Sequence, residues 1–150
     1  MLLLLLVGGG CRCAKPMAPP NLSEPGWNLR HGQAVWQPPG NRAEIAGELL
    51  FATRPDGARF LAFSKPPFPI VRVQETTNQW QIWFAPRNRT FRGNPRASAP
   101  ANPSVPVIWL HLARLLGGEP LPVGWTWQTN GAGWRIAHPG GTAIEGYLQP

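Results

Sequence analysis

The chain has 150 residues, of which 43% are hydrophobic, with eight Trp and six Phe, so a wholly disordered chain is excluded and one domain with a sizeable core is predicted. Nineteen Pro and 17 Gly predict many turns and few long helices. Fourteen Lys and Arg against seven Asp and Glu give a formal net charge of +7, which favours anionic partners such as phospholipid headgroups, acidic envelope polymers or nucleic acid.

The first residues resemble the end of a bacterial lipoprotein signal peptide. An apolar run over residues 2–7, too short to span a bilayer, is followed by three Gly and then Cys11. In such signals, small residues precede a cysteine that becomes acylated. The resemblance implies that residues 1–10 are removed and Cys11 is lipidated. The alternative, that Cys11 and Cys13 form a redox or metal pair, requires further ligands that one C-x-C pair cannot supply.

Residues 11–26 are predicted to be a tether between the lipid and a domain over residues 27–150, because from Ala14 onward they are rich in Pro and lack periodicity. Within the domain, apolar residues recur at every second position between residues 43 and 93, which is the period of a sheet with one solvated face. Turn signals such as Arg54-Pro55-Asp56-Gly57 favour hairpins between the strands. We therefore predict strands over residues 27–36, 43–53, 58–64, 70–75, 80–85 and 89–93.

The segment Lys65-Pro66-Pro67-Phe68-Pro69 is predicted to be a stiff loop that stands off the sheet edge, because its three prolines cannot donate to a ladder. Phe68 is the one large side chain in this segment. A loop flanked by prolines is a poor place to bury a lone aromatic ring, so Phe68 is either an exposed contact with a membrane or partner, or an ordinary packed residue.

The one predicted helix covers residues 107–116 and is stopped by Gly117-Gly118. It is apolar around most of its circumference, with His111 and Arg114 on a polar edge, so we expect it to plug the concave face of the sheet. Further strands are predicted over residues 125–129, 134–138 and 143–148. The predicted fold class is mainly β (α+β): a curved antiparallel sheet, or unclosed β-barrel, with one apolar helix packed against its concave face.

Catalytic and metal-binding chemistry is not predicted. The three histidines, His31, His111 and His138, lie far apart and have no neighbouring ligand at metal spacing. Glu44 and Glu48 share a strand face and could imitate an acid–base pair, but alternation with apolar residues is typical of a solvated face. No Ser lies in a G-x-S-x-G turn. We therefore expect no enzyme activity, no metal and no cofactor.

The order of these parts resembles the family of the LolB-type outer-membrane lipoprotein receptor and its periplasmic carrier relative LolA. The resemblance covers residues 27–148 and includes the loop at residues 65–69, the following Val71-Arg72-Val73, the late helix and the closing Gly133-Trp134-Arg135-Ile136. It implies a half-barrel with an apolar cavity for the acyl chains of lipoproteins in transit. It also implies that Phe68 contacts the membrane and that a periplasmic carrier protein is a partner.

The residues that would line this cavity are the apolar residues of the strands and the helix: Leu49, Phe51, Leu61, Phe63, Ile82, Phe84, Ile108, Trp109 and Leu112. Each can equally be plain core. The first hypothesis is therefore a monomeric, lipid-anchored protein of the periplasmic face of the outer membrane that binds lipid or acylated lipoproteins. The alternative is a membrane-anchored structural or interaction module with a solid core that contacts anionic envelope components through its scattered Arg residues. Nucleic-acid binding, a third interpretation, requires that the N-terminus is no signal peptide, and it is not expected.

Overall fold

A computed structural model describes residues 16–40, 42–100 and 105–150. In these residues the chain forms nine strands, one α-helix and one 3-10 turn: β1 (Asn28–Gln37), β2 (Ile45–Thr53), β3 (Arg59–Lys65), β4 (Phe68–Glu75), β5 (Trp80–Phe84), η1 (Ala85–Arg87), β6 (Arg89–Gly93), α1 (Ile108–Leu116), β7 (Thr126–Asn130), β8 (Gly133–Ala137) and β9 (Ala143–Gln149). Every predicted strand is present, and so is the predicted helix.

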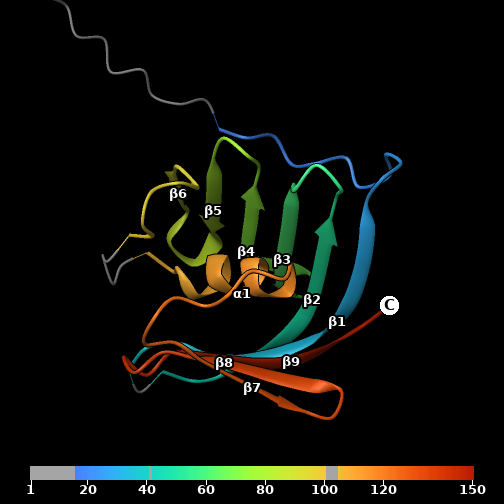
Figure 1. The fold of residues 1–150 in the computed structure, drawn as a ribbon. Helices are drawn as coiled ribbons and strands as arrows, with labels where there is room; N and C mark the ends of the chain where they lie inside the picture. Colours follow the sequence, from blue (N-terminus) through green and yellow to red (C-terminus); the bar gives the residue numbers. More distant parts are fainter. Residues whose placement is uncertain (1–15, 41, 101–104) are drawn as a thin grey trace, which may run out of the picture.

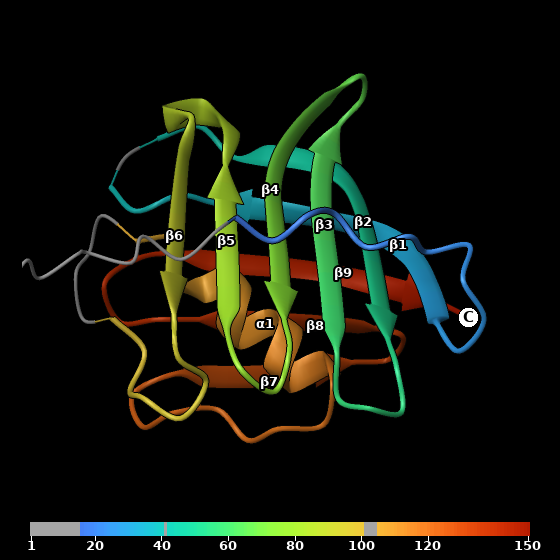
Figure 2. The same ribbon diagram turned by 90° about the horizontal axis from the view of Figure 1, so that it is seen from above.

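The strands form one antiparallel sheet in the order β6-β5-β4-β3-β2-β1-β9-β8-β7. The sheet curves around α1, and its two edge strands, β6 and β7, are not paired with each other, so the barrel stays unclosed (Figures 1 and 2). This confirms the predicted fold class, a mainly β half-barrel with one helix against its concave face. Alternation along each strand decides which side chains enter the curve.

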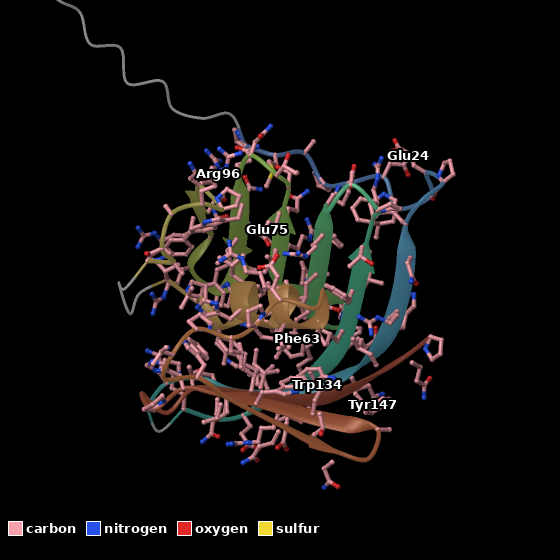
Figure 3. All side chains as sticks on the ribbon, viewed as in Figure 1. Glu24, Phe63, Glu75, Arg96, Trp134 and Tyr147 are labelled. Atoms are coloured by element: carbon pink, nitrogen blue, oxygen red, sulfur yellow. The ribbon has the colours of Figure 1, made fainter. Side chains whose placement is uncertain are left out.

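The core lies between the concave face and α1. Trp109 of α1 is fully buried; its ring stacks on Phe63 of β3 at a centroid distance of 4.8 Å and meets the edge of Trp36 of β1 at 5.6 Å. Figure 3 shows Phe63 inside the curve of the sheet. Such ring pairs contribute about 0.5–1.5 kcal/mol each beyond the area they bury. The helix therefore fills the concave face, as its apolar circumference predicts.

A buried ion cluster ties α1 to the sheet. The carboxylate of Glu75, at the end of β4, accepts a hydrogen bond from Arg59 at 3.0 Å, and it accepts two from Arg114 of α1, at 2.9 and 2.5 Å. Figure 3 shows Glu75 between the sheet and the helix. Just beyond, α1 ends at Gly117 and Gly118, as predicted. Gly118 has a φ of 92°, a conformation that glycine adopts without steric cost.

The prediction for residues 65–69 is wrong. No five-residue loop leaves the sheet there, because β3 continues to Lys65 and β4 begins at Phe68, which leaves Pro66 and Pro67 alone in the turn. Lys65 pairs with Phe68, and Ser64 pairs with Pro69 beside a register irregularity. Proline is tolerated in a ladder near a strand end or a bulge, so Pro69 does not exclude pairing here.

Residues 16–26 lie on the convex face of the sheet. The Met17 N–H donates to Gln81 Oε1 at 3.0 Å, Gln81 Nε2 donates to the Met17 carbonyl at 3.3 Å, and Gln74 Nε2 donates to the Ala18 carbonyl at 2.8 Å. Figure 2 shows this segment crossing the strands from β5 towards β1. The described part of the predicted tether therefore rests on the domain through Met17 and Ala18. Cys11 and the predicted signal peptide lie outside the described residues.

Candidate functional site at the mouth of the half-barrel

A hollow of about 620 Å³ opens at the end of the half-barrel where α1 begins. Its walls come from α1, from the chain that follows edge strand β6, from the chain that precedes edge strand β7, and from the turns after β1 and β8. We call it the mouth hollow and define it by its lining residues: Pro39, Ala97, Ser98, Ala99, Pro100, Val105, Val107, Ile108, His111, Arg114, Pro122, Trp125, His138, Gly140 and Thr142.

One face of α1 forms a wall of this hollow. Ile108, His111 and Arg114 are three residues apart, so they lie above one another on a helix of 3.6 residues per turn. Sequence analysis identified His111 and Arg114 as the polar edge of the helix, and the structure turns this edge towards the hollow. The guanidinium of Arg114 is bound to Glu75, so its charge is largely compensated.

A row of three rings continues this wall from α1 towards the turn after β8. Trp125 lies between two histidines, with its ring centroid 4.8 Å from that of His111 and 4.6 Å from that of His138. Burial lowers the pKa of His111 to about 4, and the positive charges of Arg114 and His138 lower it further in the same direction. His138 Nδ1 accepts a hydrogen bond from the Gly140 N–H at 3.0 Å. At neutral pH His111 is therefore uncharged, and the hollow presents aromatic and aliphatic surface with few polar groups.

The nine residues predicted to line a cavity all belong to the core, and each is at most 8% exposed. They pack against one another between the sheet and α1. Of the nine, Ile108 also lines the mouth hollow. Leu49 lies at the wall of a second hollow, on the convex face over β1, β2 and β9. For the other seven predicted residues, contact with an acyl chain remains a prediction.

Phe68 is 70% exposed at the turn between β3 and β4. This hairpin extends beyond the neighbouring strand ends in Figure 2. The position agrees with the first of the two alternatives drawn from the sequence, an exposed ring, although for a different reason: Phe68 is the first residue of a strand and not part of a free loop.

Sequence reasoning missed most of the mouth hollow. Trp125, His138 and the segment at residues 97–100 reach it from three separate parts of the chain, and no local pattern joins them. Trp125 gave no separate signal, because it alternates with Trp127 and was predicted to belong to the strand over residues 125–129. Within the described residues, no three His, Cys, Asp or Glu side chains lie close enough together to hold a metal ion.

A scan against protein-family models finds no match for this chain, and a search of the curated proteins finds none either. No helix in the described part of the chain has the length and the apolar character needed to cross a membrane.

Proposed function

We propose that this protein is a lipid-anchored envelope protein that binds an acyl chain of a lipid or lipoprotein in the mouth hollow. The observation that carries the proposal is the hollow itself, whose wall combines Ile108, Trp125 and the uncharged His111. Ligand sites are commonly concave, mostly apolar and between about 300 and 1,000 Å³ in volume, and this hollow has those properties.

The energy available to such a ligand is sufficient. Each methylene moved from water into apolar surroundings contributes about 0.8 kcal/mol, so eight buried methylenes contribute about 6 kcal/mol before the cost of association is subtracted. The packed core does not need to open for this binding. An acyl chain in the mouth hollow lies at the end of the half-barrel and does not displace Trp109 from its stack on Phe63.

Three further parts of the proposal come from the resemblance to the LolB and LolA family. They are lipidation at Cys11, a place on the periplasmic face of the outer membrane, and a role in lipoprotein localisation with a periplasmic carrier as partner. The exposed Phe68 supports a contact with the membrane. Catalysis, a bound cofactor and nucleic-acid binding are not part of the proposed function, and the protein is proposed to act as a monomer.

Uptake of a fluorescent acyl probe by the purified full chain tests the proposal. In the variant Ala99→Trp, an indole occupies the hollow, and we expect at least a tenfold loss of probe affinity. Ala132→Trp, in the exposed turn between β7 and β8, is the matched control and should bind like the unaltered chain. Absence of uptake by the unaltered chain, together with no lipid in an organic extract, would refute acyl binding, and so would an unchanged affinity of Ala99→Trp.

The anchor is tested separately by the intact mass of the protein recovered from membranes. We expect the mass of a chain that begins at Cys11 and carries added acyl groups. An unmodified chain that begins at Met1 in the soluble fraction would remove the anchor and would leave acyl binding in the hollow to be judged on the probe experiment alone.

The packing of the core favours a second candidate function, the structural or interaction module with a solid core. Seven of the nine predicted cavity residues contribute to neither of the two hollows described above. If neither probe nor extracted lipid is found with a correctly folded chain, this module becomes the better description of the protein.

A further inference from the structure

The positive charge of the described chain is concentrated in one stretch. Residues 65–100 contain six basic residues and one acid, Glu75, which is a net charge of +5. The rest of the described chain contains six Arg and six acids, which is a net charge of zero. The basic residues are Lys65, Arg72, Arg87, Arg89, Arg92 and Arg96, and we call the part of the sheet that carries them the basic half-sheet.

The basic half-sheet is centred on β4, β5 and β6, which lie side by side at one edge of the sheet (Figure 2); Lys65 lies at the end of β3, Arg87 in η1 and Arg96 beyond the end of β6. Its acid does not neutralise it, because Glu75 points to the core and is bound there by Arg59 and Arg114. On its convex face, the guanidinium of Arg72 lies over the ring of Trp83 at 4.9 Å. Arg92 is on the same face, one row along the strands. Arg89 pairs with the core residue Phe84 and so lies on the concave face, and the guanidinium of Arg87 lies 6.0 Å from the same Phe84 ring, so the basic side chains stand on both faces of this edge.

The N-terminal segment leads to the convex face of this edge. Gln81 of β5 binds the backbone of Met17 and also accepts a hydrogen bond from Arg92 Nε at 3.0 Å. The six residue-to-residue steps from Cys11 to Met17 can span at most about 20 Å when fully extended. A lipid attached at Cys11 would therefore hold the basic half-sheet close to the bilayer surface, and this step rests on the proposed anchor.

We propose that the edge of the sheet formed by β4–β6 and η1 docks on the surface of a bilayer that contains anionic phospholipid. Basic residues near an anionic membrane surface gain binding energy from its negative potential, and the gain corresponds to about fivefold in partitioning for each Arg. The balanced charge of the remaining sheet gives no such attraction, so the proposed orientation is defined: β4–β6 towards the lipid and β7–β9 away from it. The mouth hollow is not part of this surface.

Vesicle co-sedimentation tests the docking surface. The protein is the full chain with Cys11→Ser, which carries no lipid, and the vesicles are phosphatidylcholine with or without phosphatidylglycerol. The triple variant Arg72→Gln, Arg87→Gln, Arg89→Gln is compared with a control triple, Arg42→Gln, Arg54→Gln, Arg135→Gln, from the charge-balanced part. Both sets remove three positive charges, and each replaces one half-buried and two exposed arginines. Melting curves establish that both variants are folded.

We expect the unaltered chain to bind anionic vesicles more tightly than neutral ones and to lose this preference in high salt, which screens charge. The first triple should weaken anionic binding at least tenfold, and the control triple should change it less than about twofold. Equal effects of the two triples, no effect of either, or no preference for anionic vesicles would each overturn the proposal. Tighter binding to duplex DNA than to vesicles at the same ionic strength, lost in the first triple, would overturn it in favour of nucleic acid. Because no acyl probe is used, this result is independent of the mouth hollow.

Discussion

The ion cluster beneath α1 leads to a quantitative prediction about stability. The variant Glu75→Gln keeps the shape of the side chain but removes its charge, so two arginines that are only 14% and 15% exposed lose their buried partner. Removing one partner of a buried pair typically costs 3–5 kcal/mol. Because both guanidinium groups keep some contact with water, and Arg59 also pairs with Glu119, we expect the lower end, about 3 kcal/mol.

Urea denaturation followed by circular dichroism measures this loss as a lower transition midpoint with an unchanged slope. The matched control is Glu145→Gln. Its ion pair with Arg135 spans 3.7 Å between side chains that are 60% and 44% exposed, and exposed pairs contribute at most about 1 kcal/mol. If the two variants lose the same free energy of unfolding, the cluster at Glu75 does not hold α1 against the sheet. The wall of the mouth hollow would then need another explanation, since Arg114 belongs to both.

Three further predictions concern the site and the sheet. Because the pKa of His111 is about 4 in the folded protein and 6.5 in the unfolded chain, the unfolded state binds more protons between these values. The free energy of unfolding should therefore fall by up to about 3 kcal/mol as pH drops from 6.5 to 4. The variant His111→Gln should lose this pH dependence. The same fall in the free energy of unfolding in both proteins would contradict the prediction. Phe68→Ser should leave the melting temperature unchanged but reduce insertion into lipid, measured by surface pressure, whereas Val123→Ser, at another exposed apolar residue, should not reduce it. Equal insertion of both variants would argue against a membrane contact at Phe68. Gly47→Ala should destabilise the fold by about 1–3 kcal/mol in thermal melts. The added Cβ would lie 2.3 Å from the Ser64 carbonyl oxygen and 2.9 Å from the Phe63 ring. A variant as stable as the unaltered chain would show that β2 and β3 can separate.

The strands and the helix could be predicted because the signals for them are local. Alternation in β2 places Leu49 and Phe51 on one face wherever the strand pairs, and Gly118 stops α1 by its own backbone freedom. The one local prediction that is wrong, the loop at residues 65–69, failed because pairing with Ser64 and Lys65 keeps Phe68 and Pro69 in the ladder. A proline removes one donor, but it does not prevent the neighbouring residues from pairing.

The positive charge of the basic half-sheet can be counted from the sequence, because Glu75 is the one acid among residues 65–100. Sequence analysis treated the basic residues as scattered because they are not consecutive. Only the strand order brings Arg72 and Arg92 to one face, since residues far apart in a meander become neighbours through the register of the ladder.

The sequence by itself therefore determined the class of fold, the strands and the helix, the buried face of strands such as β2 and the apolar character of α1. These follow from periodicity, which depends on the nearest few residues. Only the tertiary structure decided that Trp109 stacks on Phe63, that Glu75 reaches Arg59 and Arg114, and that Trp125 meets His111 and His138 at the mouth of the half-barrel. These contacts depend on the curvature of the sheet and on the path of the chain between β6 and β7, which no short pattern encodes.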